Sequence, residues 1–218
     1  MQILYEDAAL IVAVKPIGTV SESTSAKDGF ADLLAAHCGG YISVVHRLDR
    51  GVGGVTVYAK FPAAAASLSD AVRTHTLKKE YLAAVAGHPH PDGGELRDLL
   101  FHDRFKNKTF VADRPRKGVK EAVLDFETLQ TVSHPACGEA SLLRVRLHTG
   151  RTHQIRVQFS SRGHALLGDG KYGSRVKGDI GLFCRRLEIP HPVTGKVLVL
   201  EAFPTGEPWS IFADMPKQ

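Results

Sequence analysis

An aspartate between two arginines forms the densest group of reactive side chains in the first half of the sequence. The segment is His46-Arg-Leu-Asp-Arg50, and valine-rich runs that predict strands lie on both sides of it. Nearby positive charge keeps a carboxylate ionised, which is the form that a nucleophile or a general base requires. Asp49 is therefore either a catalytic carboxylate or one partner of a salt bridge that fixes the loop.

A second polar group lies where a predicted strand turns into a predicted helix. It reads Leu147-His-Thr-Gly-Arg-Thr-His-Gln-Ile-Arg156. A tight glycine turn here can direct backbone N–H groups and arginines to one anion, either a phosphate or a carboxylate. If the helix begins near Thr152, Arg156 lies one turn later on the same face and can reach inward toward Asp49. The alternative is an exposed, capped helix start that is rich in basic residues.

The elements that must position these residues predict an α+β fold with a large, mainly antiparallel mixed sheet flanked by helices and loops. Strands are expected at residues 2–5, 10–14, 44–45, 55–58, 80–85, 122–131, 140–148, 181–189 and 196–202. Helices are expected at 28–38, 62–73 and 153–162. Thr152 is the expected N-cap of the third helix, and Ser25 with Asp28 resembles a capping box for the first. Residues 88–120 are expected to form a surface excursion with short strands.

Charge and composition narrow the class of protein. Lys and Arg outnumber Asp and Glu by 28 to 23, which favours a polyanionic partner such as nucleic acid. The three cysteines form no CxxC pair, so that neither a disulfide framework nor a thiolate zinc site is predicted. Because the sequence has neither a secretory signal pattern nor an apolar run of roughly 18 residues, we expect a cytoplasmic protein without membrane contact.

Taken together, the two polar segments resemble the RluA-type family of RNA pseudouridine synthases. In that family the active aspartate lies in an HRLD segment, a Lys-x-Tyr strand follows, and a later GR[ST]HQ[IL]R segment carries the basic partner. The corresponding segments here are His46–Asp49, Lys79–Tyr81 and Gly150–Arg156. The family's KPxG turn, GDxxYG segment and late strand with its turn resemble Val14–Gly18, Leu167–Gly173 and Arg186–Gly195. The resemblance thus extends in order and spacing over nearly the whole chain.

The resemblance implies a pseudouridine synthase catalytic domain over residues 1–218. Because strand patterns begin at residue 2, we expect no N-terminal S4-like domain. Such an enzyme isomerises specific uridines of tRNA or ribosomal RNA and needs no cofactor and no metal. Asp49 would be the essential nucleophile or base, Arg156 would pair with it, and Tyr81 would stack on the target base and take part in C5 deprotonation. A tyrosine that only packs remains the alternative for Tyr81. For the whole chain the alternative is a catalytically weak or inactive RNA-binding or RNA-folding module.

Basic side chains near the two segments are the expected RNA contacts, and no obligate protein partner is expected. They are Arg47, Arg50, Arg144, Arg146, Arg151 and His153. Arg47 is also a candidate to fill the space that an extracted nucleotide leaves. Members of the family commonly have Thr-Ser where this chain has Val52-Gly53, so that two hydroxyls that can order the loop or touch RNA are missing.

A metal site is a competing interpretation of the histidines. His88-Pro-His90 with His102 is a candidate ligand set, but a proline-separated pair in a loop more often lies exposed in solvent. No HExxH motif supports the metal interpretation. We therefore expect no metal in catalysis.

Overall fold

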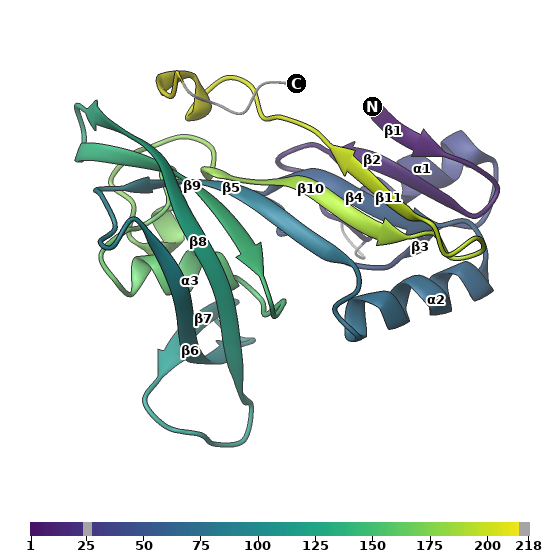
Figure 1. Cartoon of the computed structure of the whole chain (residues 1–218), viewed down its shortest axis with the longest axis horizontal. Coiled ribbons are helices and arrows are strands. Elements are labelled where there is room, and N and C mark those ends of the chain that lie inside the picture. Colours follow the sequence, from purple (N-terminus) through teal and green to yellow (C-terminus); the bar gives the residue numbers. More distant parts are fainter. Residues whose placement is uncertain (24–27, 214–218) are drawn as a thin grey trace. The chain divides into compact units, whose positions relative to one another are not determined.

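The computed structural model describes residues 1–23 and 28–213, and Ser25 of the expected capping box lies outside them (Figure 1). The chain forms two compact units. The first unit consists of Met1–Glu80 and Phe183–Pro204, and the second of Tyr81–Leu182 and the segment from Thr205 onwards. The predicted single catalytic domain over 1–218 stays a prediction.

Strands of the first unit form a mixed sheet. They are β1 (Gln2–Glu6), β2 (Leu10–Lys15), β3 (Ser43–Val44), β4 (Gly53–Ala59), β10 (Leu182–Pro190) and β11 (Val197–Glu201). The order is β1-β2-β4-β10, with β3 beside β4 and β11 beside β10. β10 pairs with β4 in parallel, whereas the β1–β2, β2–β4 and β10–β11 pairs are antiparallel. Every residue of β4 is buried, as expected for a central strand rich in β-branched residues.

Two helices of the first unit form where the sequence predicts them. Helix α1 (Phe30–Cys38) ends at Gly39, whose φ of 67° gives the left-handed turn typical of a helix C-terminus. Its Phe30 ring meets the ring of Tyr58 on β4 edge to face, with centroids 6.0 Å apart. Helix α2 (Pro62–Arg73) begins with its proline in the first turn, where the missing N–H costs nothing.

The second unit contains longer strands. They are β5 (Lys78–Ala86), which enters this unit at Tyr81, β6 (Gly93–Asp103), β7 (Lys108–Ala112), β8 (Val119–His134) and β9 (Gly138–Leu147). The β6–β7, β6–β8 and β8–β9 pairs are antiparallel. The order is β5-β9-β8-β6-β7. The expectation of a surface excursion with short strands over 88–120 was wrong, because β6 pairs with β8 along nine residues, from Gly93 to Phe101. Leu96 and Leu100 are buried on one face of β6, and Asp98 between them on that face interrupts the apolar alternation that would have identified this strand.

Helix α3 (Gln154–Ser160) lies on the strands of the second unit. Its Phe159 ring packs edge to face on Phe126 of β8, with centroids 5.4 Å apart. Residues 154–159 are all buried, so the alternative of an exposed helix start does not hold for the helix itself. The expected N-cap was also wrong, because His153 and not Thr152 precedes the helix, and it has a left-handed φ of 55°.

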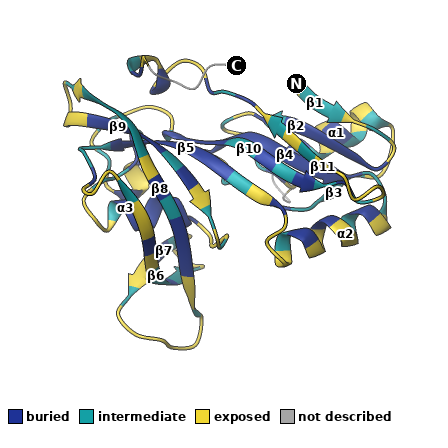
Figure 2. Ribbon diagram, viewed as in Figure 1, coloured by how far each residue is buried: buried dark blue, intermediate teal, exposed yellow. Residues whose placement is uncertain are grey.

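The mixed, mainly antiparallel strand pairing, together with the three α-helices of the described residues, confirms the predicted α+β class. Two short 3-10 helices, η1 (Gly170–Tyr172) and η2 (Trp209–Ile211), complete the elements. Figure 2 shows that the buried residues are concentrated in the strands. Among the residues that the structure describes, no helix is long and apolar enough to cross a membrane.

Candidate active site

The main chain around Asp49 is clamped by the N-terminal part of the first unit. Ser21 Oγ donates a hydrogen bond to the carbonyl oxygen of Leu48 at 3.0 Å and accepts one from the Leu48 N–H at 3.1 Å. On the other side of Asp49, the Gly18 N–H donates to the carbonyl oxygen of Arg50 at 2.8 Å. These hydrogen bonds to the main chain on both sides of Asp49 fix the backbone from which its carboxylate projects. Asp49 itself is partly exposed.

His46 supports the same loop from inside. Its side chain is buried, and Nε2 accepts a hydrogen bond from the Val57 N–H of β4 at 3.4 Å. Burial, together with the positive charge of Lys79, holds the pKa of His46 well below its usual value. The imidazole is therefore neutral at physiological pH and serves as a fixed support.

A buried lysine places a positive charge near Asp49. Lys15, at the end of β2, is fully buried, and its Nζ donates to the carbonyl oxygens of Pro16 at 3.0 Å and Thr19 at 2.7 Å. Burial lowers the pKa of Lys15 to about 8, and the negative charge of Asp49 opposes this shift. The sequence pattern around Asp49 points instead to Arg47 and Arg50 as the neighbouring charges. The KPxG segment was the signal that pointed to Lys15.

Arg47 and Arg50 lie at the surface with partners of their own. The Arg47 side chain is 71% exposed and approaches the Glu22 carboxylate at 3.3 Å. Arg50 Nε donates to the carbonyl oxygen of Gly18 at 2.9 Å. Because both side chains lie at the surface, they are better placed to contact a polyanion than to stabilise a charge inside the unit.

Residues that replace the family's Thr-Ser pair lie inside the first unit. Val52 and Gly53 are both buried, and a Cβ at Gly53 would lie 3.1 Å from Ile17 Cγ1 and 3.3 Å from the Lys15 carbonyl oxygen. Gly54 has a φ of 128°, and a Cβ there would overlap the Cys184 backbone of β10. Hydroxyls at these buried positions would not reach RNA, so the departure changes the packing under the loop and not its surface.

In the second unit, Arg156 forms a buried ion pair that the sequence pattern did not predict. Its Nε and Nη2 donate to the two carboxylate oxygens of Asp169 at 2.7 and 2.8 Å, and both side chains are nearly inaccessible. The guanidinium carbon also lies 5.0 Å from the centre of the Tyr172 ring. Asp169 and Tyr172 belong to the GDxxYG segment, which was the available signal. Tyr81, on β5, is buried as well, with 5% of its surface exposed.

The polar groups of the turn before α3 form hydrogen bonds within the second unit. Gln154 Oε1 accepts hydrogen bonds from the Arg151 N–H at 3.0 Å and from the Thr149 hydroxyl at 2.8 Å. Gln154 Nε2 donates to the Val123 carbonyl oxygen of β8 at 3.1 Å. The Arg151 side chain is exposed, and its Nε donates to the Glu121 carbonyl oxygen at 2.8 Å. This turn is thus held by Gln154, and it presents Arg151 at the surface.

His153 is held inside the second unit. The side chain is 8% exposed, and Nδ1 shares a hydrogen bond of 2.9 Å with the Tyr172 hydroxyl. The same hydroxyl accepts a hydrogen bond from the Thr109 N–H at 2.8 Å. His153 therefore joins α3 to β7 and to η1, and its predicted RNA contact stays a prediction.

The strand at 140–148 has the predicted apolar and basic faces. Leu143 and Val145 are fully buried, whereas Arg146 and His148 are more accessible. Carboxylates on neighbouring β8 partly neutralise the basic face. Arg144 approaches Glu127 at 3.0 Å, and His148 approaches Asp125 at 2.7 Å.

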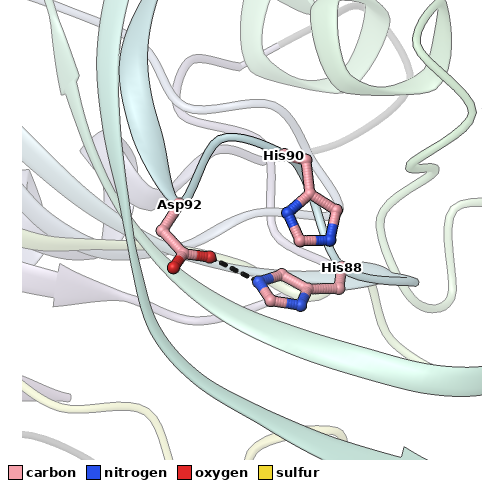
Figure 3. Close-up of side chains that lie close together, drawn as sticks. All are labelled: His88, His90 and Asp92. Atoms are coloured by element: carbon pink, nitrogen blue, oxygen red, sulfur yellow. Dashed lines mark hydrogen bonds and ion pairs between the residues drawn. The ribbon is translucent and has the colours of Figure 1, made fainter.

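Three side chains on the β5–β6 connection lie as metal ligands do. Figure 3 shows His88, His90 and Asp92, whose ligand atoms all lie within 4.8 Å of one another. His88 Nε2 is 2.5 Å from Asp92 Oδ1, and the two imidazole rings are 4.3 Å apart. His102, the other histidine of the candidate set, instead contacts the Thr109 hydroxyl at 3.1 Å. A hydrogen bond between His88 and Asp92 and the packing of the two rings already account for the cluster, two of whose members are exposed.

Comparison with known proteins decides the family. Residues 9–161 match the family described as RNA pseudouridylate synthase. The chain is 31% identical over 224 residues to ribosomal large subunit pseudouridine synthase D of Zymomonas mobilis, covering 93% of this chain and 68% of that one. The chain belongs to the RNA pseudouridine synthase family. It is also 33% identical to an uncharacterized RNA pseudouridine synthase of Bacillus subtilis, YhcT, over 93% of this chain and 68% of that one.

Solved structures agree with the fold of this pseudouridine synthase. Human RNA pseudouridylate synthase domain containing 1 superposes with a TM-score of 0.79 at 21% identity, covering 93% of this chain and 83% of that one. Human RNA pseudouridylate synthase domain containing 4 gives 0.75 at 22% identity, with 93% and 88% covered. The predicted resemblance to the RluA-type family is confirmed, and the chain is an RNA-modifying isomerase.

Proposed function

We propose that this pseudouridine synthase isomerises specific uridines of tRNA or ribosomal RNA and that Asp49 is its essential carboxylate. The observation that carries the proposal is the clamped loop, in which Ser21 holds Leu48 directly before Asp49. The buried ammonium group of Lys15 adds a positive charge close to the carboxylate. A rigid backbone and a nearby cation suit a carboxylate that must react in its ionised form.

The reaction breaks the N1–C1′ bond of uridine, turns the uracil and joins its C5 to C1′. Because it involves no net oxidation or hydrolysis, it needs no cofactor. An ionised Asp49 can attack C1′, add to the pyrimidine ring or remove the C2′ proton, and the proposal covers all three routes. Tyr81 is proposed to stack on the target base and to take part in C5 deprotonation.

Arg156 is proposed as the basic residue of the catalytic group. Its two bonds to Asp169 support this role, since a guanidinium held at two points keeps one orientation. The proposed RNA contacts remain Arg47, Arg50, Arg144, Arg146, Arg151 and His153. Their phosphate contacts would offset the few kcal/mol that extraction of the target nucleotide costs. The proposal includes no obligate protein partner.

The deciding experiment compares Asp49→Asn with the wild-type protein in pseudouridine formation, RNA affinity and thermal stability. Asn keeps the shape of the side chain but has neither its nucleophilicity nor its basicity, so we expect no detectable product with affinity and stability retained. Asp70→Asn, at an exposed position of α2, is the matched control and should remain active. Mapping pseudouridines in total RNA from cells with and without the protein would then identify the target.

Two outcomes would contradict the proposal. Near-normal conversion by folded Asp49→Asn protein would end the catalytic assignment. A wild-type protein that binds RNA but converts no uridine in any RNA would instead be an RNA-binding or RNA-folding module of the same fold.

A further inference from the structure

Positive charge is concentrated at one end of the β6–β7 hairpin. Seven of the 28 Lys and Arg of the chain lie between residues 104 and 120, with Asp113 as the single acid. They are Arg104, Lys106, Lys108, Arg114, Arg116, Lys117 and Lys120. We call residues 103–120, which include the turn, β7 and the loop to β8, the basic arm. The loop between β7 and β8 is the long exposed segment in Figure 2.

Several arginines elsewhere on this unit have carboxylate partners. Arg97 pairs with Glu121, Arg144 with Glu127, and Arg162 with Asp98. Over residues 1–23 and 28–213, none of the seven cations forms such a pair. Mutual repulsion of uncompensated like charges disfavours the compact state, and a bound polyanion removes that repulsion.

The turn at the tip of the basic arm presents an aromatic ring to solvent. Asp103 Oδ1 accepts hydrogen bonds from the backbone N–H groups of Phe105 and Lys106, both at 3.0 Å. This side-chain cap fixes the turn, and Phe105 is fully exposed. A single exposed apolar side chain is common on protein surfaces, but Phe110 and Val111 are exposed on the same hairpin.

Cationic side chains of the basic arm lie close to aromatic rings of the same hairpin. The ammonium groups of Lys106 and Lys108 lie 6.0 and 5.8 Å from the centre of the Phe110 ring. The Arg116 guanidinium lies 5.3 Å from the centre of the Phe101 ring. Surfaces that bind single-stranded nucleic acid combine such rings, on which bases stack, with cations that hold the backbone phosphates.

The base of the arm is fixed to the segment that carries Arg156. Thr109 Oγ1 donates to the carbonyl oxygen of Thr152, and the Thr109 N–H donates to the Tyr172 hydroxyl, both at 2.8 Å. Lys171 Nζ donates to the carbonyl oxygen of Asn107 at 3.0 Å. A ligand held by the basic arm is therefore held in a fixed position relative to α3.

A groove lies between the arm and the turn before α3. Its volume is about 630 Å³, and its walls include Phe105, Arg104, Lys120 and Arg151. This volume lies in the range of pockets that take small organic ligands, so one nucleotide can enter. The acid in its wall, Asp103, already accepts two hydrogen bonds from the turn. The groove therefore presents positive charge beside an aromatic ring.

We propose that the basic arm is an RNA-binding element, in which Phe105 stacks on an unpaired base and the surrounding cations hold phosphates. Arg104, Lys120 and Arg151 contact the phosphates at the groove. This inference rests on the proposed function, because it takes the RNA bound by the basic arm to be the substrate of the enzyme. RNA is favoured over an acidic protein because the rings are exposed between the cations, which suits bases linked by phosphates.

The test uses the full chain, two fluorescein-labelled RNAs and three variants. One RNA is a stem-loop with a uridine-containing loop, and the other is a fully paired duplex. Phe105→Ala should weaken binding of the stem-loop by about tenfold and leave the duplex nearly unchanged, since stacking needs an unpaired base. The double variant Arg104→Ala/Lys120→Ala should weaken both and lower the salt slope by about 0.7 to 0.9 for each phosphate that the arm no longer holds. Arg97→Ala, which removes one paired cation of β6, is the charge control.

A second readout separates this inference from the proposed catalytic function. Phe105→Ala should raise KM for the stem-loop and leave the single-turnover rate at saturating RNA unchanged. In the Asp49→Asn background, which makes no product, the same tenfold fall in affinity should appear. If neither arm variant weakens RNA binding more than Arg97→Ala does, the RNA-binding arm is overturned while the catalytic proposal stands. An equal fall in affinity for stem-loop and duplex with Phe105→Ala would overturn the stacking role.

Discussion

Arg156 and Asp169 form a two-point ion pair in which the guanidinium donates at 2.7 and 2.8 Å and both side chains are buried. The pair joins the first turn of α3 to the segment before η1. Burying two charges costs more solvation free energy than an exposed pair does, so such a pair is stable only when both partners are present. It thereby fixes the orientation of a residue that the resemblance places in the catalytic group.

We expect Asp169→Asn to lower the free energy of unfolding by about 3 to 5 kcal/mol, because it removes a carboxylate from a buried guanidinium. Urea denaturation measures this change. Glu95→Gln, in the exposed pair with Arg97, is the matched control and should cost less than about 1 kcal/mol. Equal changes in the two variants would mean that the Arg156 pair contributes no more than a surface pair.

His46 should make stability fall in mild acid. Its pKa is depressed in the folded protein, so below the usual value of 6.5 the unfolded chain binds a proton that the folded chain does not. The unfolded state therefore gains about 1.4 kcal/mol per pH unit, or about 2 kcal/mol between pH 6.5 and about pH 5. Above pH 6.5 the contribution is constant.

Denaturation of His46→Gln over the same pH range tests this sign. We expect a flatter acid limb than that of the wild-type protein, since Gln does not titrate and can still accept the Val57 N–H. His75→Asn is the control, because residue 75 is exposed and its φ of 58° is tolerated by Asn. Parallel curves for wild type and His46→Gln would show that the buried imidazole takes up its proton without cost.

Local sequence was sufficient to predict the helix ends and turns that are determined by the backbone preferences of single residues. The proline at the start of α2 and the left-handed Gly39 at the end of α1 mark boundaries by backbone chemistry alone. The turn at Pro190–Gly195 likewise joins β10 and β11 as predicted. In each case the preference for a turn or a helix end lies in the residue itself.

The start of α3 was predicted wrongly because its determinants are distant in sequence. Gln154 bonds to Val123, and His153 bonds to Tyr172, so that the backbone before the helix is set by β8 and η1. A helix buried on all sides also lacks the apolar and polar faces from which its limits are predicted.

The cation near Asp49 was missed for a similar reason. Arg47 and Arg50 are its neighbours in sequence, but Lys15 is brought to the loop by the pairing of β2 with β4, in which Lys15 faces Gly54. Sheet register determines this contact, and sequence proximity does not predict it.

Uridine conversion should survive removal of transition metals. The proposed reaction transfers a base within one nucleotide, so a chelator such as phenanthroline, with magnesium kept constant for RNA folding, should leave the rate unchanged. The double variant His88→Ala/His90→Ala, in the cluster of Figure 3, should be equally active, since the proposed reaction uses no metal. Activity that disappears in chelator and is restored by zinc would contradict this expectation.

Arg151 and Arg144 should differ in their contribution to RNA binding. The Arg151 guanidinium is exposed and donates to a neutral carbonyl oxygen, whereas Arg144 is half-buried and already approaches the carboxylate of Glu127 at 3.0 Å. A cation that is paired with a carboxylate releases fewer counterions from RNA than an uncompensated one. We therefore expect Arg151→Ala to lower the salt slope of binding by about one and Arg144→Ala to lower it by less.

Measuring the dissociation constant of each variant at several salt concentrations tests this difference. Glu127→Gln is the informative companion to Arg144→Ala, because it frees the Arg144 guanidinium from that carboxylate and should raise the salt slope if the guanidinium can reach a phosphate. Lower turnover with an unchanged slope for Arg151→Ala would move Arg151 from RNA binding into the catalytic group. An equal fall in slope for both arginines would mean that RNA displaces Glu127 from Arg144, and the acidic residues of β8 would then not limit binding on this face.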